Sequence, residues 1–343
     1  MIRKKLAIDL GNDNIKIAGM DDNNNQVLKL IKSKATTDSL DSNYVVNYNN
    51  RNIYFGVGNP LIKSNKVERE YIIETIFLAL SQITECTKDT IILDLAIGLP
   101  LELYKSTIKE TYETNLRQQY CNKLLSAKIN NNNINIIINS IQIFAEGYSG
   151  YLAIYDYIDI TDNLISIIEI GYKTTDVITI SIDGNNIPHI DNYTTIDKGT
   201  YNINNDILQG IINTTQNKLS LSTIESALIP NNNPLIKVNL DNTIKHINVW
   251  DYTHHASATV NNIFNEIELK MPDIRTRTNY LIGGGNVLVD DIINNHINTN
   301  NKLTRIDTLI FDDTNLSIFA NVLGYYMQIG EQPLNIDKLY RIA

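Results

Sequence analysis

The chain of 343 residues is long enough for about two domains, and its 43% hydrophobic and 20% charged residues are ordinary for a globular protein. Its 29 basic and 38 acidic residues give a formal net charge of −9, which excludes a protein that grips nucleic acid broadly through counterion release. Two isolated cysteines, Cys86 and Cys121, and the lack of an apolar run of about 20 residues exclude disulfide-stapled and membrane-spanning classes and favour a cytoplasmic protein.

Residues 6–17 predict a β-hairpin whose tip holds phosphate. An apolar run ends in Asp9, turns over a polar loop at Gly11 and re-enters an alternating run. Gly11 can take a positive φ and let the backbone come close to a ligand, and the backbone N–H groups of residues 11–14 would donate to phosphate oxygens. Asp9 would then lie beside the accompanying metal. Alone, Asp-x-Gly at the end of a strand is more often a plain turn, so the prediction depends on its repetition.

Between the two hairpins, the apolar spacing predicts five elements. They are strands at residues 26–33, 90–98 and 134–144, and helices at residues 67–83 and 101–125. The polar segment at residues 34–65 predicts a small inserted subdomain. Glu146 opens a helix that carries tyrosines on one face, an arrangement more typical of a packed core than of a functional site.

The repetition begins at residue 164. Residues 164–177 again run through an apolar strand, a carboxylate at Glu169, a glycine at Gly171, a polar loop and a returning apolar strand. Two such hairpins imply two related halves that face one ligand. The sequence therefore predicts an α/β architecture of duplicated domains, each beginning with a hairpin.

The second half continues through a strand-to-helix junction at residues 197–201 and an irregular insertion at residues 204–249. The spacing then predicts an amphipathic helix at residues 260–271, a strand that ends in Gly283, Gly284 and Gly285, and a last helix at residues 319–329. Each glycine costs roughly 0.5–1 kcal/mol against alanine, so the triplet needs a reason. Either a flat ligand such as adenine approaches closely, or the chain makes a tight strand-to-helix turn.

Four features in this order resemble the phosphate-1, connecting, phosphate-2 and adenosine motifs of the superfamily of actins, heat-shock chaperones and sugar kinases. They are the Asp9 hairpin, Glu146 at the start of a helix, the Glu169 hairpin and the three glycines. Within this superfamily the chain most resembles the ParM-like bacterial actins that segregate plasmids, and the resemblance also includes residues 97–100 and 319–326.

The resemblance implies an actin-like ATPase fold of two ribonuclease-H-like domains with nucleotide in the cleft. The first domain would comprise residues 1–161 and 321–343, with an inserted subdomain at 34–65. The second would comprise residues 162–320, with an inserted subdomain at 204–249.

The resemblance also implies a role for each motif residue. Asp9 would bind the magnesium shell, Glu146 would orient the attacking water, and Glu169 would be the second carboxylate at the metal. Lys16 would reach the β- and γ-phosphates. The full set expected to bind nucleotide is Gly11, Asn12, Asn14, Lys16, Gly171, Tyr172, Lys173, Thr174, Gly199, Gly283, Gly284, Gly285 and Asn286. The family usually has Asp in place of Glu169 and Gly or Ser in place of Tyr172, which leaves the hydrolysis rate and the choice of ATP or GTP open.

As a function, the resemblance implies a slow, magnesium-dependent ATPase or GTPase that assembles into filaments and hydrolyses faster when assembled. Such a filament would segregate or position plasmid DNA through an adaptor protein on a centromere-like site, without contacting nucleic acid or membrane itself. The filament contacts are expected mainly on the two insertions. Anchoring by the short terminal segment at residues 336–343 is disfavoured, because the segment is only modestly apolar.

Two alternatives stay open: a non-polymerising small-molecule kinase of the same fold, and a scaffold that binds nucleotide without hydrolysing it. The two isolated cysteines exclude the cysteine-rich zinc segment of kinases of similar length. The histidines show no ligand spacing, and the adjacent pair His254 and His255 is predicted to lie in a surface loop.

Overall fold

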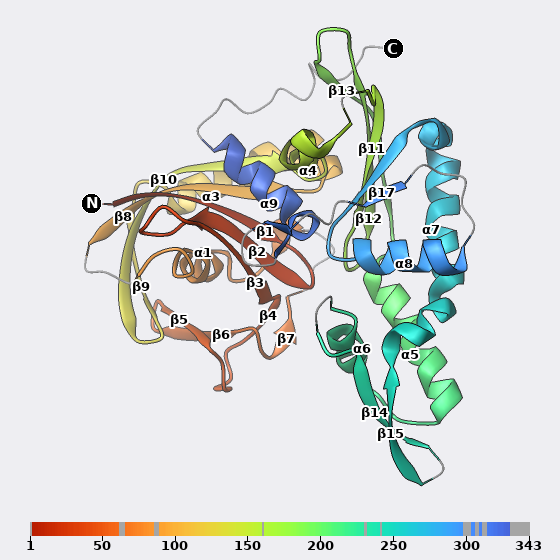
Figure 1. Ribbon diagram of the computed structural model, residues 1–343. Coiled ribbons are helices and arrows are strands. Elements are labelled where there is room, and N and C mark those ends of the chain that lie inside the picture. The colour runs from red at the N-terminus through yellow and green to blue at the C-terminus, as the bar shows by residue number, and fades with distance from the viewer. Residues whose placement is uncertain are drawn as a thin grey trace. The chain divides into compact units, whose positions relative to one another are not determined.

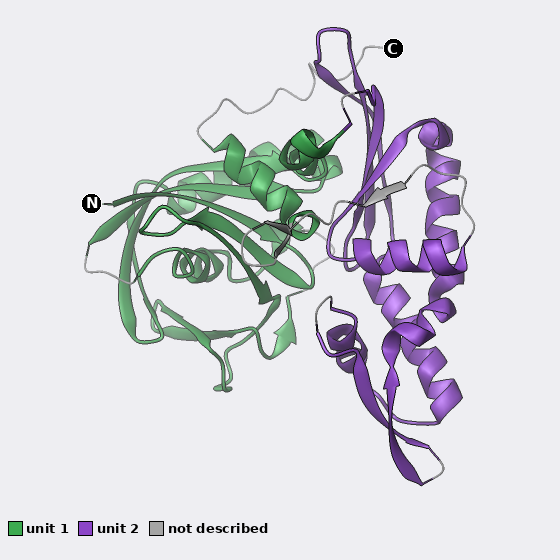
Figure 2. Cartoon of the chain, in the orientation of Figure 1, with its two compact units in different colours: residues 1–158, 308–339 green, residues 159–307, 340–343 purple. Residues whose placement is uncertain are grey.

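The computed structural model describes residues 2–61, 66–85, 89–159, 161–229, 232–240, 242–297, 303–305, 309–310 and 314–329. These residues form two compact units, shown in Figure 2. Unit 1 comprises the described residues of 1–158 and 308–339, and unit 2 those of 159–307.

Unit 1 is built on a sheet of ten strands in the order β3-β2-β1-β8-β10-β9-β5-β6-β4-β7 (Figure 1). The strands are β1 Ile2–Leu10, β2 Asn14–Met20, β3 Gln26–Lys32, β4 Lys34–Thr36, β5 Tyr44–Tyr48, β6 Arg51–Phe55, β7 Asn59–Pro60, β8 Thr90–Leu99, β9 Leu124–Ile129 and β10 Asn132–Ala145. The helices described in this unit are α1 Ile72–Leu80, α2 Leu101–Lys105, α3 Thr107–Tyr120, α4 Tyr148–Ile154 and α9 Leu316–Gln328, with short 3-10 turns η1 Lys66–Glu68 and η2 Tyr155–Tyr157. A two-stranded pair, β18 Leu309–Ile310 and β19 Thr314–Asn315, precedes α9.

Helices cover the central strands of this sheet, which explains why β8 is an almost uninterrupted apolar run. Helix α9 packs on α4 and on β1, β2 and β8. A Cβ at Gly324 of α9 would lie 1.9 Å from the carbonyl oxygen of Ser149 in α4, so these two helices touch backbone to backbone. Helix α1 lies within the curve of the sheet, against β1, β5 and β9, and contributes the apolar face of Ile73, Ile76 and Phe77 (Figure 1).

Unit 2 has a sheet of five strands in the order β13-β12-β11-β16-β17 and a separate hairpin of β14 and β15. The strands are β11 Leu164–Ile170, β12 Thr175–Ile182, β13 Pro188–Ile196, β14 Leu235–Leu240, β15 Thr243–Asn248, β16 Thr278–Ile282 and β17 Leu303–Arg305. The described helices are α5 Thr200–Thr215, α6 Leu221–Ala227, α7 Ser257–Lys270 and α8 Asn286–His296, with 3-10 segments η3 Val249–Ala256 and η4 Pro272–Thr276.

The two units repeat one strand arrangement. In unit 1, β3, β2 and β1 are antiparallel neighbours, and β8 and β10 then follow parallel to β1. In unit 2, β13, β12 and β11 are antiparallel in the same order, followed by the parallel strands β16 and β17. The duplication predicted from the two hairpins is therefore confirmed at the level of topology.

The predicted helix at residues 101–125 is wrong in its length. The helix breaks at Ser106, whose backbone is extended and whose hydroxyl caps α3 by accepting from the N–H of Ile108. Helix α3 ends at Tyr120, and Leu124 begins the strand β9. The apolar residues of β9 alternate with polar ones, a strand period that the helix interpretation overlooked.

Two other predicted segments also differ from the structure. The helix predicted at residues 67–83 is shorter: α1 begins at Ile72 because Tyr71 before it is left-handed, with φ 59°. The segment at residues 204–249 is not irregular, since α5 covers its first part and α6, β14 and β15 follow. The strands of the segment at residues 34–65 join the large sheet through the pairing of β5 with β9.

Several predictions concern residues outside the described part of the chain: the thiol of Cys86, the end of the last helix at Gly330 and the weakly apolar segment 336–343. In the part that the structure does describe, no helix combines the length and the apolar character required of a membrane span.

Candidate functional site

The first hairpin places Asp9 and Lys16 opposite each other. The two residues are cross-strand partners in the antiparallel pairing of β1 with β2. Lys16 Nζ lies 3.0 Å from Asp9 Oδ2, and both side chains are largely buried. The predicted carboxylate and the predicted phosphate-binding lysine are therefore brought together by the register of the hairpin.

Lys66 is a second cation at this tip, and its role was not predicted from the sequence. It comes from η1, and its Nζ lies 2.5 Å from Oε1 of Glu146 and 3.6 Å from Oδ1 of Asp9. Glu146 follows the end of β10 and lies two residues before the start of α4, and its backbone N–H donates to the carbonyl of Leu99 at the end of β8. The ammonium group of Lys66 thus links Asp9 in β1 to Glu146 after β10, and Glu146 in turn is hydrogen-bonded to the end of β8.

Asp9 is held as a carboxylate by this arrangement. Burial by itself would raise the pKa of Asp9, but the ammonium groups of Lys16 and Lys66 outweigh burial and keep the pKa below its ordinary value. Its Oδ1 atom is buried and accepts no hydrogen bond from the described part of the protein. An oxygen in this condition suits a ligand that brings its own donor or cation.

Arg69 holds the hairpin tip from the other side and was also missed by sequence reasoning. Its Nη1 donates to the carbonyl oxygens of Leu10 at 2.5 Å and Gly11 at 3.0 Å, and its Nη2 donates to the hydroxyl of Ser33. Burial lowers the pKa of Arg69 to about 10. The only sequence signal for Lys66 and Arg69 is their place between a polar insertion and an apolar helix.

The loop of the first hairpin does not use the left-handed conformation that its glycine allows. Gly11 does not have a positive φ. A glycine is needed there because a Cβ would lie 2.5 Å from the carbonyl oxygen of Asn14. Asn14 Nδ2 donates to Asp13, which also binds Lys32. Asn12 lies in the same bend and is partly exposed.

The second hairpin repeats the close packing of the loop glycine, but a different pair of side chains faces across its strands. A Cβ at Gly171 would lie 2.9 Å from the carbonyl oxygen of Thr174, the equivalent of the contact in the first loop. Glu169 is buried and faces Asp176 across the strands, where the first hairpin pairs an acid with a lysine. Asp176 accepts hydrogen bonds from the hydroxyls of Thr174 and Thr195.

The start of α5 closes onto this second loop. The N–H groups of Thr200 and Tyr201 donate to the carbonyls of Gly171 and Tyr172. A Cβ at Gly199 would lie 2.5 Å from the first of these carbonyls, which explains the glycine at the junction. Two N–H groups at this helix start are therefore already used inside the protein.

The side chains of this loop point to neighbouring elements of unit 2. The hydroxyl of Tyr172 donates to Glu225 of α6 at 2.9 Å, and its ring packs edge-on against Tyr201. Lys173 Nζ lies 5.8 Å from the centre of the Tyr201 ring. Tyr172, the residue that departs from the family pattern, thus links the loop to α6.

The three glycines before α8 differ in what a side chain would meet at each position. Gly283 has φ +91°, and a Cβ there would lie 2.6 Å from the carbonyl oxygen of Ile170. A Cβ at Gly285 would lie 2.3 Å from Cγ2 of Thr200. A Cβ at Gly284 would have no neighbour within 4 Å among the residues that the structure describes. The tight turn therefore explains two of the glycines, and the backbone at Gly284 is open.

No group of three His, Cys, Asp or Glu side chains in the described ranges could hold a metal ion by itself. His254 and His255 lie in η3 and are exposed, on the surface as predicted, although in a 3-10 segment rather than a loop.

The charges at the first hairpin fit an anionic ligand. Three cations, Lys16, Lys66 and Arg69, surround two carboxylates, Asp9 and Glu146, which leaves one positive charge in excess within this group. A phosphate chain supplies both the anionic oxygens for the lysines and, with its counter-ion, a partner for the buried Asp9 oxygen. The donor set therefore fits a nucleotide phosphate.

Comparison with known families supports this assignment. Residues 7–148 match the family described as "Actin like proteins N terminal domain", and residues 167–295 match "Archaeal actin homologue MreB-like, C-terminal". No curated protein sequence matches the chain.

Solved structures resemble the chain over almost its whole length. The archaeal actin homologue Ta0583 has a TM-score of 0.71 at 17% identity, covering 95% of this chain and 98% of its own. ParM from a 15-stranded filament of Clostridium botulinum has a TM-score of 0.67 at 21% identity, covering 95% and 99%. Bacillus thuringiensis ParM with ATP has a TM-score of 0.64 at 14% identity, covering 96% and 98%.

The α/β fold predicted from the two hairpins is thus confirmed as the actin-like fold. From the two matching family regions and the duplicated topology, we conclude that this chain belongs to the actin-like ATPase superfamily and has a ParM-like architecture.

Proposed function

We propose that this protein is a magnesium-dependent nucleoside triphosphatase that assembles into filaments. The observation that carries the proposal is the group of Lys16, Lys66, Asp9 and Glu146 at the tip of the first hairpin. It combines cations for a phosphate chain with a carboxylate that can orient water, within one rigid network.

Each residue of the group has a distinct task in the proposed reaction. Lys16, held beside Asp9, carries positive charge to the phosphate chain. Lys66 holds the carboxylate of Glu146 at 2.5 Å, so that this carboxylate can accept a hydrogen bond from the attacking water. Backbone N–H groups of the loop at residues 11–14 add uncharged donors.

Asp9 would hold magnesium near its buried Oδ1 atom, which accepts no hydrogen bond from the described part of the protein, and the ion would neutralise charge on the phosphate oxygens. Glu169 is the second carboxylate that we assign to the metal shell. Adenosine or guanosine would lie along Gly284 in unit 2, where the backbone is open.

The neighbouring structures support binding of ATP and self-assembly in proteins of this fold. Ta0583 has been solved in complex with ADP, and Bacillus thuringiensis ParM with ATP and with AMPPNP. The Clostridium botulinum ParM is part of a filament. By this likeness we extend the proposal to plasmid DNA, which the filament would move in the cytoplasm through an adaptor protein on a centromere-like site.

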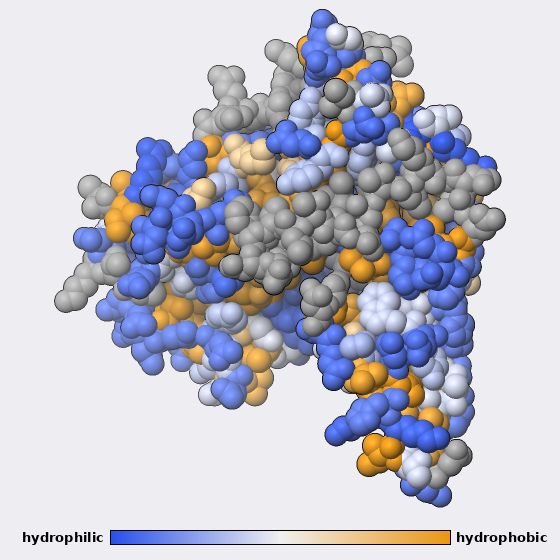
Figure 3. All heavy atoms as spheres, in the orientation of Figure 1, coloured by the Kyte–Doolittle hydropathy of each residue, from blue (hydrophilic) through white to orange (hydrophobic). Residues whose placement is uncertain are grey.

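The second insertion offers a surface for such assembly. Its exposed apolar side chains are Ile229, Leu235 and Ile244, with exposed fractions of 44%, 48% and 75%. Figure 3 shows apolar residues among hydrophilic ones over the part of the surface that belongs to β14 and β15. Exposed apolar side chains on and beside a hairpin are suited to contact a second copy of the chain.

The first test is right-angle light scattering of the purified protein with magnesium and ATP, GTP, ADP or no nucleotide, followed by negative-stain microscopy. We expect scattering to rise only with a triphosphate, and filaments on the same grids. A flat signal with nucleotide binding intact would contradict assembly and favour a kinase or a non-hydrolysing scaffold, which a substrate screen would then separate.

The second test addresses hydrolysis directly. Glu146→Gln keeps the size of the side chain and removes its charge, so phosphate release should fall about 100-fold while nucleotide still binds. Glu113→Gln on α3, where the acid pairs with Lys109 and Arg117, is the matched control and should hydrolyse normally. Equal rates of phosphate release in the wild type and Glu146→Gln would remove Glu146 from the mechanism.

A further inference from the structure

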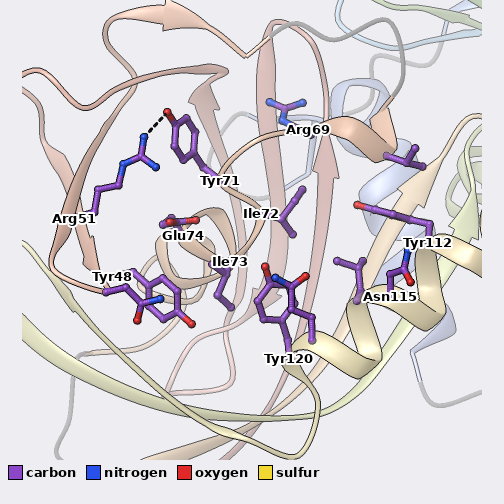
Figure 4. A pocket seen from close by; sticks show the side chains of 14 residues that line it. Tyr48, Arg51, Arg69, Tyr71, Ile72, Ile73, Glu74, Tyr112, Asn115 and Tyr120 are labelled. Carbon is purple, nitrogen blue, oxygen red and sulfur yellow. Dashed lines mark hydrogen bonds between the residues drawn. The ribbon is translucent and has the colours of Figure 1, made fainter.

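Unit 1 contains a cavity that is separate from the residues at the tip of the first hairpin. Its volume is about 490 Å³, and it lies between β5, η1, α1 and α3 (Figure 4). None of Asp9, Lys16, Gly11 or Glu146 lines it. The volume is within the range of small-molecule sites in proteins.

The wall of this cavity is rich in aromatic rings and carries cations at both ends. Four tyrosines line it: Tyr48, Tyr71, Tyr112 and Tyr120. The charged residues among its described lining are Arg51, Arg69 and Glu74. Burial raises the pKa of Glu74, and Arg51 opposes this effect from nearby, so the single acid faces its own cation.

Two polar groups in the cavity wall are buried and have no hydrogen-bond partner among the residues that the structure describes. Arg69 is 6% exposed, and its Nε atom finds no acceptor in the described ranges, although both of its other nitrogens are used. Tyr112 is 7% exposed, and its hydroxyl likewise lacks a partner within the described part of the chain. In Figure 4 this hydroxyl points towards the middle of the hollow.

Leaving such donors buried and unsatisfied is unfavourable, by an amount comparable to a lost hydrogen bond for each group. Arg69 adds a positive charge that Asp9, with which it interacts, does not fully neutralise, because Asp9 also pairs with Lys16 and Lys66. Burial raises the pKa of Tyr112 to about 12, so its hydroxyl remains a donor at neutral pH. An anionic oxygen in the cavity would satisfy both groups at once.

We propose that this cavity binds a small planar acid, with an aromatic or heteroaromatic ring between the tyrosines and a carboxylate or phosphate oxygen at Arg69 and Tyr112. Stacking against tyrosine selects a flat ring, and the paired donors select the anion. The same guanidinium holds the carbonyls of Leu10 and Gly11, so an occupied cavity also stabilises the first hairpin.

The test is a fluorine NMR titration of the full chain, without nucleotide, using para-fluorobenzoate and its neutral isostere para-fluorobenzamide. We expect the acid to bind with a dissociation constant on the order of 1 mM, an affinity reasonable for so small a probe, and the amide at least about tenfold more weakly. Amide hydrogen exchange at residues 9–14 should slow when the acid is present.

Tyr112→Phe removes only the hydroxyl and should weaken binding of the acid about tenfold. Tyr151→Phe is the matched control, because Tyr151 is also buried in unit 1, its hydroxyl has no hydrogen-bond partner among the described residues, and it does not line the cavity. Equal binding of acid and amide, equal loss in the two variants, or no binding of the acid up to about 10 mM would each overturn the proposal. Because nucleotide is left out, these results do not depend on the proposed triphosphatase activity.

Discussion

The ammonium group of Lys66 lies 2.5 Å from a carboxylate oxygen of Glu146, a residue 80 positions later in the chain. The same ammonium group is 3.6 Å from Asp9. Lys66 thus connects the carboxylate that we assign to the metal shell with the carboxylate that we assign to water. It is the centre of the candidate site.

Replacing Lys66 should therefore separate catalysis from binding. In Lys66→Ala the Glu146 carboxylate loses the cation that positions it, and a misplacement of about 1 Å can reduce a rate about 100-fold. We expect phosphate release to fall at least about tenfold and nucleotide affinity, measured by titration calorimetry, to fall less. Lys109→Ala, which removes an ion pair of 2.8 Å on α3, should change neither. A parallel loss of both quantities in Lys66→Ala would mean that Lys66 only binds the phosphate chain.

The lowered pKa of Asp9 predicts a dependence of stability on pH. Because the folded state holds the pKa of Asp9 below its ordinary value of 3.8, the contribution of this group to stability is fully present above that pH. It is lost as the pH falls through the folded value. Urea unfolding of Asp9→Asn between neutral pH and pH 3 or so should show a smaller loss of unfolding free energy than the wild type. Identical curves for the two proteins would contradict the role given to Lys16 and Lys66.

The three glycines should respond differently to substitution by alanine. Gly283→Ala and Gly285→Ala should each lower the unfolding free energy by about 2 kcal/mol, the first through its φ of +91° and the second through the contact with Thr200. Gly284→Ala has open space and should change stability by less than about 0.5 kcal/mol.

Nucleotide affinity should respond to Gly284→Ala, although stability should not. If the base or its sugar approaches the backbone there, Gly284→Ala should weaken nucleotide binding in a fluorescence titration although the protein is as stable as the wild type. Unchanged nucleotide affinity in this variant would mean that the three glycines serve only the strand-to-helix turn.

Glu169 should control the magnesium dependence of binding. Carboxylate oxygens are the ligands that magnesium and its waters prefer, so Glu169→Gln should reduce the gain in nucleotide affinity that magnesium provides. Asp176→Asn alters the cross-strand partner, which binds Thr174 and Thr195, and should leave this gain intact. The measurement is nucleotide affinity with and without magnesium in both variants, and a similar loss in the two would argue against Glu169 as the metal carboxylate.

Local sequence patterns accounted for much of the fold. Strand alternation and turn residues depend on neighbours a few positions apart, and so both hairpins, the buried strand β8, the helix α7 and the strand before the glycines could be predicted. The break at Ser106 was also local, since a serine followed by a helical segment is a common cap, but the polar helix pattern on both sides concealed it.

The sequence by itself determined the order of the motifs and the duplication, because both follow from strand alternation and turn residues within each hairpin. The register that sets Asp9 opposite Lys16 is a property of the folded hairpin. Only the tertiary structure decided that Lys66 meets Glu146, that Arg69 holds the carbonyl of Leu10, and that Gly199 packs on the loop at Gly171. Those contacts join segments 28 to 80 residues apart, from Gly171–Gly199 to Lys66–Glu146. Their geometry depends on the order of strands in the sheet and on the path of the connections, which no local periodicity encodes.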